Sequence, residues 1–215
     1  MKIAVLGTGM VGKTIGSKLI KLGHDVKMGS RTRDNAKAVE WAAGAGNRAS
    51  CGIFAEAAAF GEIVFNCTAG VNSIAALTLA GAENLNGKIL VDVSNPLDFS
   101  KGMPPSLTVC NTTSLGEQIQ AEFPQARVVK TLNTVNCNVM VNPELVPGDH
   151  DIFVSGNDDK AKAKVTEILQ DWFGWKHVID LGDLSAARGT EMYLPLWLRM
   201  WGVLETANFN IKIVK

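Results

Sequence analysis

A glycine-rich turn near the start of the chain constrains the fold more than any other feature. The sequence GTGMVG at residues 7–12 fits the pattern G-x-G-x-x-G, follows the apolar stretch 1–6 and precedes apolar residues at helical spacing. Gly7 permits a tight turn, Gly9 lets the backbone approach a phosphate group, and Gly12 brings the helix close to the strand. The helix start then attracts a pyrophosphate. The segment predicts a dinucleotide-binding turn, with a glycine turn that binds nothing as the weaker alternative.

Apolar runs of five to seven residues alternate with longer amphipathic stretches over about the first 180 residues. This alternation is typical of βα units around a parallel sheet. Together with the glycine turn, it predicts an α/β fold of the Rossmann type, with a doubly wound, mostly parallel sheet and a short C-terminal helical element. The expected strands are 1–6, 25–29, 62–67, 88–93, 127–132, 151–155 and 177–181.

The pattern divides the chain into a dinucleotide-binding domain, 1–182, and a C-terminal helical element, 183–215. About thirty residues cannot form an independent domain, so we expect this element to pack on the core or on a second subunit. Its most apolar window, 193–204, is too short to span a bilayer and contains Arg199. Apolar residues recur there at helical spacing: Leu194, Trp197, Leu198, Trp201 and Leu204.

Charge and cysteine content exclude several classes of partner. Lys and Arg number 21 and balance 21 Asp and Glu, which argues against nucleic acid or an anionic membrane as partner. The four cysteines are scattered with no C-x-x-C pair, so we expect no structural metal. The N-terminus has no signal-peptide pattern. We therefore expect a cytoplasmic protein with free thiols.

The residues after the expected strand 25–29 indicate which dinucleotide binds. An NAD enzyme usually carries Asp or Glu there to bind the ribose hydroxyls, but this chain has GSRTR at 29–33. A carboxylate would repel a 2′-phosphate, whereas Ser30 can donate a hydrogen bond to it and Arg31 can pair with it. The sequence therefore predicts NADP rather than NAD. Arg33 and Lys37 are further candidates, each with a solvated helix start as the alternative.

The segment 94–113 is rich in proline and follows the carboxyl end of a strand, where open α/β sheets place their ligands. We expect it to border a ligand. Cys67 and Cys137 lie near the same predicted edge. Neither has a neighbouring His or a second Cys in sequence, so we expect no reactive-thiol chemistry.

No catalytic residue is predicted. His24, His150 and His177 do not follow the carboxyl end of an expected strand, where a catalytic base is expected. Carbonyl reduction would need a proton donor such as Tyr or Lys near the nicotinamide. The single tyrosine, Tyr193, lies in the terminal segment, and Lys130 lies within an expected strand.

Six motifs together resemble a known family, the NADP-dependent oxidoreductases named for coenzyme F-420, a deazaflavin. They are GTGMVG, GHDVKMGSR, DVSNPLDF, VVKTLNTVN, VSGNDD and LGDLSAARGTEMYLPLWLRM, and they extend over nearly the whole chain. The resemblance implies a Rossmann core, NADPH bound across it, a homodimer, and hydride transfer between nicotinamide and a flavin-like ring.

The resemblance also implies binding roles by position. Asn133-Thr134 stands where the deazaflavin reductases typically carry His-Thr, and it is similar to the cytosolic domain of STEAP-type ferric reductases, which passes hydride to a flavin. The acceptor can therefore be FMN, FAD or coenzyme F-420. The implied sites are Thr8, Gly9, Met10 and Val11 for the pyrophosphate, Ser30, Arg31 and Arg33 for the 2′-phosphate, Thr68, Ala69, Asn72, Asn95 and Pro96 for the nicotinamide half, and Asn133 and Thr134 for the acceptor ring.

Hydride transfer to a flavin-type ring needs orientation and exclusion of water more than an acid or base, in agreement with the lack of a predicted catalytic group. Two alternatives stay open, which are reduction of a small carbonyl or imine and a non-enzymatic NADP(H) sensor. Trp197 and Trp201 can stack on an acceptor ring or form a dry dimer interface. We expect a dimer through the helix at 192–204.

Overall fold

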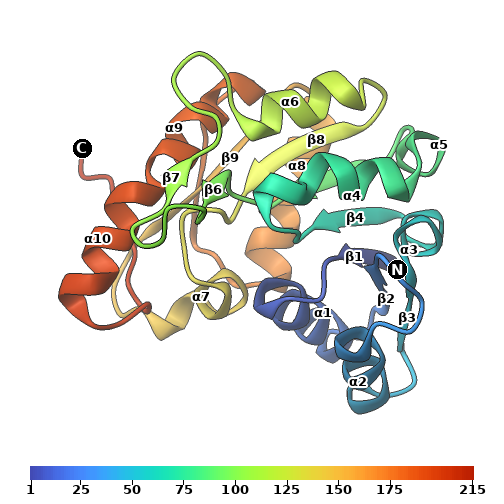
Figure 1. The fold of residues 1–215 in the computed structure, drawn as a ribbon. Helices are drawn as coiled ribbons and strands as arrows, with labels where there is room; N and C mark the ends of the chain where they lie inside the picture. The colour runs from blue at the N-terminus through green and yellow to red at the C-terminus, as the bar shows by residue number, and fades with distance from the viewer.

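Eight strands form one sheet in the computed structural model, which describes all residues 1–215 (Figure 1). The strands are β1 (Lys2–Leu6), β2 (Asp25–Ser30), β3 (Ala49–Ile53), β4 (Ile63–Asn66), β5 (Ile89–Asp92), β8 (Arg127–Thr131), β9 (Asp151–Gly156) and β10 (His177–Asp180). Their order across the sheet is β10-β9-β8-β5-β4-β1-β2-β3. The chain winds outward in both directions from β1, so the predicted doubly wound Rossmann-type fold is confirmed.

One strand of the sheet was not predicted. The seven expected strands are all present, but β3 at the sheet edge reads ASCGI and carries small residues that give no run of large apolar side chains. It pairs in parallel with β2, with Met28 opposite Cys51. An edge strand has only one neighbour and is half-buried, which explains its weak pattern.

Two strands run against the rest. β9 pairs antiparallel with β8, with Thr131 opposite Val154, and β10 is parallel to β9. Apolar runs predict a strand but not its direction, so this reversal could not be predicted from the sequence. The starts of β9 and β10 therefore lie at the edge of the sheet where the other strands end.

This reversal brings His150 to the ligand edge without making it a base. Its Nε2 lies 3.0 Å from the carbonyl oxygen of Pro143, and its Nδ1 lies 2.9 Å from Nδ2 of Asn210. Because the Asn210 amide can only donate here, Nδ1 accepts and Nε2 carries the proton. Both ring nitrogens are used, so His150 has a structural role, as expected.

Helices cover both faces of the sheet and create two cores (Figure 1). In β1, Ile3 and Val5 belong to one core, and Ala4 and Leu6 to the other. Burial on both faces explains why the strands are continuous apolar runs. The first core is covered by α1 (Met10–Lys21), α2 (Ala36–Ala45), α7 (Cys137–Val141) and α8 (Asp159–Glu167), and the second by α3 (Phe54–Phe60), α4 (Ser73–Ala80), α5 (Ala82–Leu85), α6 (Leu115–Glu122) and α9 (Ala187–Met192).

Helix ends follow local sequence signals. Gly23 has φ of +87° after α1, where its N–H donates to the Ile20 carbonyl while His24 N–H reaches the Leu19 carbonyl. This is the Schellman arrangement that a glycine in this position favours. The Asp158 side chain accepts a hydrogen bond of 2.7 Å from the N–H of Ala161 at the start of α8. Glycine after a helix and aspartate before one are the residue types that favour these two caps.

The segment 94–113 contains a two-stranded antiparallel ribbon of β6 (Leu97–Asp98) and β7 (Ser106–Leu107). The Thr108 N–H donates to the Pro96 carbonyl at 2.8 Å and closes the base of this ribbon. Strands of two residues leave too short a pattern to predict from sequence.

The C-terminal element packs against the core. It consists of a 3₁₀ turn (Leu184–Ala186), α9, α10 (Leu194–Leu204) and a tail that returns to the start of β9. The Asp151 N–H donates to the Ile211 carbonyl at 3.0 Å, and the Ile213 N–H donates to Asp151 Oδ2 at 2.6 Å. No helix of the chain combines the length and apolarity needed to cross a membrane.

Two exposed glycines test the role of backbone conformation. A Cβ added at Gly23 or at Gly44 meets no atom within 4 Å, but only Gly23 has a positive φ. We expect Gly23→Ala to lower the free energy of unfolding by about 1 kcal/mol, because an L-residue is strained there. Gly44→Ala, inside α2, should raise it by about 0.5–1 kcal/mol. Urea titration measures both, and equal signs would contradict the explanation.

Candidate functional site

The glycine turn forms a cradle that a pyrophosphate fits. Gly7 has φ of +117°, and a Cβ added at Gly12 would lie 2.1 Å from the Gly7 carbonyl oxygen, so both positions require glycine. At Gly9 an added Cβ meets nothing within 4 Å, which leaves open space over the start of α1. The first turn of α1 has no side-chain cap and no acidic residue. Its N–H groups are free to bind an anion.

Two cavities flank this turn and share three residues at the end of β4, Cys67, Thr68 and Ala69. The smaller has a volume of about 360 Å³ and the larger about 500 Å³. They lie where the strand order reverses beside β1, which is the position at which doubly wound sheets bind dinucleotides. Two neighbouring cavities at this position suit the two halves of a dinucleotide.

The smaller cavity joins a cationic end to an apolar wall. Ser30 is the last residue of β2, where its hydroxyl donates to the Thr32 carbonyl at 2.5 Å, and Arg31 follows it and lines the same cavity. Phe54, from the start of α3, and Leu79, from α4, add apolar surface that suits an adenine ring. Phe54 directly follows β3, which was not predicted, so its place in this wall could not be predicted either. The remaining lining residues are Gly7, Thr8, Gly9, Asn35, Asn72, Ala75 and Ala76.

Arg33 does not line this cavity. Its guanidinium forms an ion pair with Glu56 on α3. Glu56 also accepts a hydrogen bond of 3.3 Å from the Ile53 N–H, so the carboxylate is held at the start of α3. Of the predicted cations, the structure therefore brings Arg31 to the cavity and pairs Arg33 with a carboxylate.

The larger cavity is mostly apolar and is built from distant parts of the chain. Met10 and Val11 come from the glycine turn, Leu97 and Phe99 from the ribbon, and Trp197 from α10. The segment 94–113, which we expected to border a ligand, therefore lines part of this cavity. The other lining residues are Gly70, Val71, Val93, Ser94, Asn95, Asp98, Asn133, Val135, Asn136, Cys137, Met140 and Leu194.

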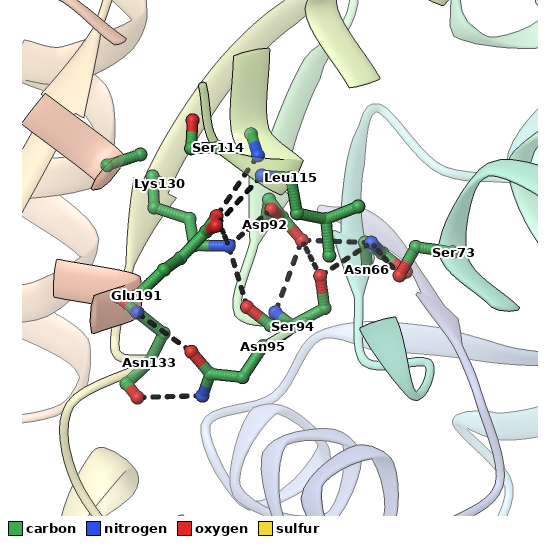
Figure 2. A network of polar contacts seen from close by, with 12 residues as sticks. Asn66, Ser73, Asp92, Ser94, Asn95, Ser114, Leu115, Lys130, Asn133 and Glu191 are labelled. Carbon is green, nitrogen blue, oxygen red and sulfur yellow. Dashed lines mark hydrogen bonds and ion pairs between the residues drawn. The ribbon is translucent and has the colours of Figure 1, made fainter. Parts of the chain in front are cut away.

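An amide pair stands in the wall of the larger cavity (Figure 2). Asn95 Nδ2 donates to the Asn133 carbonyl at 2.8 Å, and Asn133 Nδ2 donates to Asn95 Oδ1 at 3.0 Å. The neighbouring residues Pro96 and Thr134 line neither cavity, and the Thr134 hydroxyl is buried without a hydrogen-bond partner. The structure therefore brings Asn95 and Asn133 together at the cavity, whereas Pro96 and Thr134, which were predicted with them, lie outside its wall.

A buried charge network lies behind this pair (Figure 2). Lys130 Nζ is 2.8 Å from Asp92 Oδ2, 2.8 Å from Glu191 Oε1 and 2.6 Å from the Ser94 carbonyl oxygen. Burial lowers the pKa of Lys130, but the Asp92 and Glu191 carboxylates outweigh it, so the pKa lies above its ordinary value. All three ammonium protons are engaged, and Lys130 has none to give to a substrate.

The titratable groups at the cavity do not form an acid–base pair. No histidine and no lysine lines it, and Tyr193 does not either. Burial, followed by the nearby Asp92, raises the pKa of the Cys67 thiol, which keeps it protonated. Hydrogen bonds from Ser100 lower the pKa of Asp98. The wall can orient a ligand and exclude water, but it offers no Tyr or Lys proton donor.

The two tryptophans of α10 have different environments. Trp197 is 9% exposed, lines the larger cavity and stacks on Phe209 with ring centroids 5.1 Å apart. Trp201 lies one turn further along α10 and is 43% exposed. Helical spacing predicts that both tryptophans lie on one face of α10, but it does not predict which of them the C-terminal tail covers. Trp197 is thus a cavity residue that sequence reasoning left undecided.

Comparison with known proteins identifies the family. The model of the family described as NADP oxidoreductase, coenzyme F-420-dependent, matches residues 2–96. A crystal structure from Arthrobacter sp. FB24, provisionally named an F-420-dependent NADP-reductase, is 55% identical, covers 100% of both chains and has a TM-score of 0.95. The chain belongs to the coenzyme F-420-dependent NADP oxidoreductase family. It is therefore an NADP-dependent oxidoreductase, as predicted.

Two curated relatives are more distant. The F-420-dependent NADP reductase of Methanocaldococcus jannaschii is 33% identical over 115 residues, which is 53% of this chain and 51% of the relative. Metalloreductase STEAP3 of Rattus norvegicus is 28% identical over 201 residues, 91% of this chain and 38% of the relative. The chain thus spans about half or less of the curated relatives it matches. The acceptor, the homodimer and the cytoplasmic location stay predictions.

The position of Arg31 generates a test of cofactor selection. We expect Arg31→Ala to weaken NADPH binding by about 10- to 100-fold while NADH binding changes little, because a hydrogen bond to a charged group contributes about 1.5–3 kcal/mol. Isothermal titration calorimetry with both dinucleotides measures this. Lys37→Ala is the matched control, since it removes the same charge outside the cavity. Equal losses for NADPH and NADH would contradict the assignment.

Proposed function

We propose that the protein transfers hydride between NADP(H) and a flavin-type ring, FMN, FAD or coenzyme F-420, held in the larger cavity. The observation that carries this proposal is the cavity itself. It shares Cys67, Thr68 and Ala69 with the adenosine-side cavity, is mostly apolar, and has no Tyr or Lys side chain in its wall. Such a wall suits two flat rings held face to face.

The chain offers a binding group for each part of the cofactor. The N–H groups at the start of α1 hold the pyrophosphate, and Arg31 pairs with the 2′-phosphate. Ser30 donates to this phosphate when its hydroxyl turns away from the Thr32 carbonyl. Thr68 and Ala69 line both cavities, and Asn72 lines the smaller one. The nicotinamide then enters the larger cavity beside Asn95 and Asn133. When bound, NADPH supplies the hydride.

The protein's own part in the reaction is to orient the two rings and to shield them from water. Met10, Val11 and Trp197 present apolar surface from different sides, which excludes water from the reacting rings. Holding the two rings in reacting geometry replaces a collision in solution by a step within one complex. Reduction of a carbonyl or imine is less well supported, because the cavity offers no Tyr or Lys proton donor.

The acceptor is tested by following NADPH oxidation. We expect loss of nicotinamide absorbance near 340 nm when FMN, FAD or coenzyme F-420 is added, and no loss with a small aldehyde, because the wall lacks a proton donor for the new alcohol. Steady absorbance with every ring acceptor, despite tight NADPH binding, would contradict the proposal and favour a sensor. Oxidation by the aldehyde alone would favour carbonyl reduction.

We propose further that the protein is a homodimer that pairs through α10. Leu196 and Val203 are seven residues apart in this helix, so they lie on the same side of it, and they are 56% and 82% exposed. Apolar residues gathered on one face of a helix are typical of a protein–protein contact.

Sedimentation velocity tests the dimer. We expect a dimer at micromolar concentration, and a monomer for Val203→Glu, because the change would bury a charge in an apolar contact. Val214→Glu makes the same change at an exposed valine outside the helix and should leave the dimer intact. A monomeric native protein would contradict the proposal.

A further inference from the structure

The amide pair Asn95–Asn133 is the polar part of the wall best suited to the nicotinamide carboxamide. Each side-chain amide donates one N–H to the other residue, so one N–H of each amide stays available to a ligand. A carboxamide presents an oxygen that accepts such bonds. What matters for recognition is then how firmly the pair is held in place.

Asn95 is held through the residue before it. The Ser94 N–H and hydroxyl both donate to Asp92 Oδ1, at 3.2 and 2.6 Å, and the Ser94 carbonyl accepts from Lys130 at 2.6 Å. The peptide after Asn95 packs closely on Gly70, where an added Cβ would lie 2.0 Å from the Asn95 carbonyl oxygen. Every polar backbone group of Ser94 is therefore tied to the charge network.

Lys130 in turn depends on Glu191, which comes from α9 in the C-terminal element. Glu191 is 1% exposed and lines neither cavity. One carboxylate oxygen lies 2.8 Å from Lys130 Nζ and accepts the Gly116 N–H at 3.1 Å, while the other accepts the Leu115 N–H at 2.8 Å. Glu191 thus fixes the ammonium group against the start of α6.

We propose that Glu191 is a positioning residue for the nicotinamide half of the site. Through Lys130 it fixes the Ser94 peptide and with it the Asn95–Asn133 amide pair, so a helix outside the dinucleotide-binding domain sets the geometry of hydride transfer. This inference rests on the proposed placement of the nicotinamide in the larger cavity.

The test compares a ligand with both halves, NADPH, and one with the adenosine half alone, adenosine 2′,5′-bisphosphate. We expect Glu191→Gln to weaken NADPH binding about tenfold, which corresponds to about 1.4 kcal/mol, and to leave the bisphosphate within about twofold. The fluorescence of bound NADPH should also fall, because a loosely held nicotinamide is quenched. Glu191→Asp keeps the charge but shortens the reach, so it should not restore native binding.

Glu117→Gln is the matched control. Glu117 lies in the first turn of α6, and Arg188 of α9 donates from Nε to its Oε2 at 2.8 Å. Like Glu191 it lines neither cavity, but its side-chain contacts are with Arg188 and Ser114 and not with Lys130. It should lower the melting temperature without changing either affinity. If Glu191→Gln behaves in the same way, or weakens both ligands equally, Glu191 only stabilises the fold and the proposal is wrong.

A second variant keeps the test open if Glu191 cannot be changed without unfolding. Asn95→Ala removes the end point of the chain of contacts, and it should reproduce the selective loss of NADPH affinity. Unchanged NADPH affinity would overturn the proposal. These binding measurements need no acceptor, so an inactive protein that still shows the selective loss would contradict the proposed function and support this inference.

Discussion

The arrangement of the molecule depends on one buried positive charge. Lys130 ends inside the sheet edge with 1% of its side chain exposed, and a lone ammonium group cannot be buried there. Asp92 neutralises it from the adjacent strand, and Glu191 binds it from the C-terminal element. This second contact fixes where α9 lies, and α9 leads directly into the helix that carries Trp197. Removal of one partner from such a buried pair typically costs about 3–5 kcal/mol.

The fold could be predicted where the determinants are local. The apolar runs, Gly23 and Asp158 each act within a few residues, and the elements they predict are present. β3 was not predicted, because an edge strand needs few large apolar side chains. The reversed direction of β9 was not predicted for another reason. The pairing of Thr131 with Val154 depends on contacts between distant segments, which produce no periodic pattern in the sequence.

The site follows the same division. The glycine turn and Ser30-Arg31 could be singled out because the residue types that favour phosphate binding stand next to one another in the sequence. Arg33 was assigned to the same pocket from its charge, but its ion pair with Glu56 depends on the position of α3. Trp197 and Glu191 come from the last quarter of the chain, and only the folded arrangement shows that one reaches the cavity and the other supports it.

The two cavities differ in which parts of the chain build them. Residues between 7 and 79 make the whole adenosine-side wall, whereas residues beyond 92 supply most of the other wall. The match to the family model, residues 2–96, ends near this boundary. With the two rings placed as proposed, cofactor selectivity and acceptor choice are encoded in successive segments of one gene. Recombination or divergence in the later segment would alter the electron partner while the earlier segment keeps its preference for a phosphorylated dinucleotide.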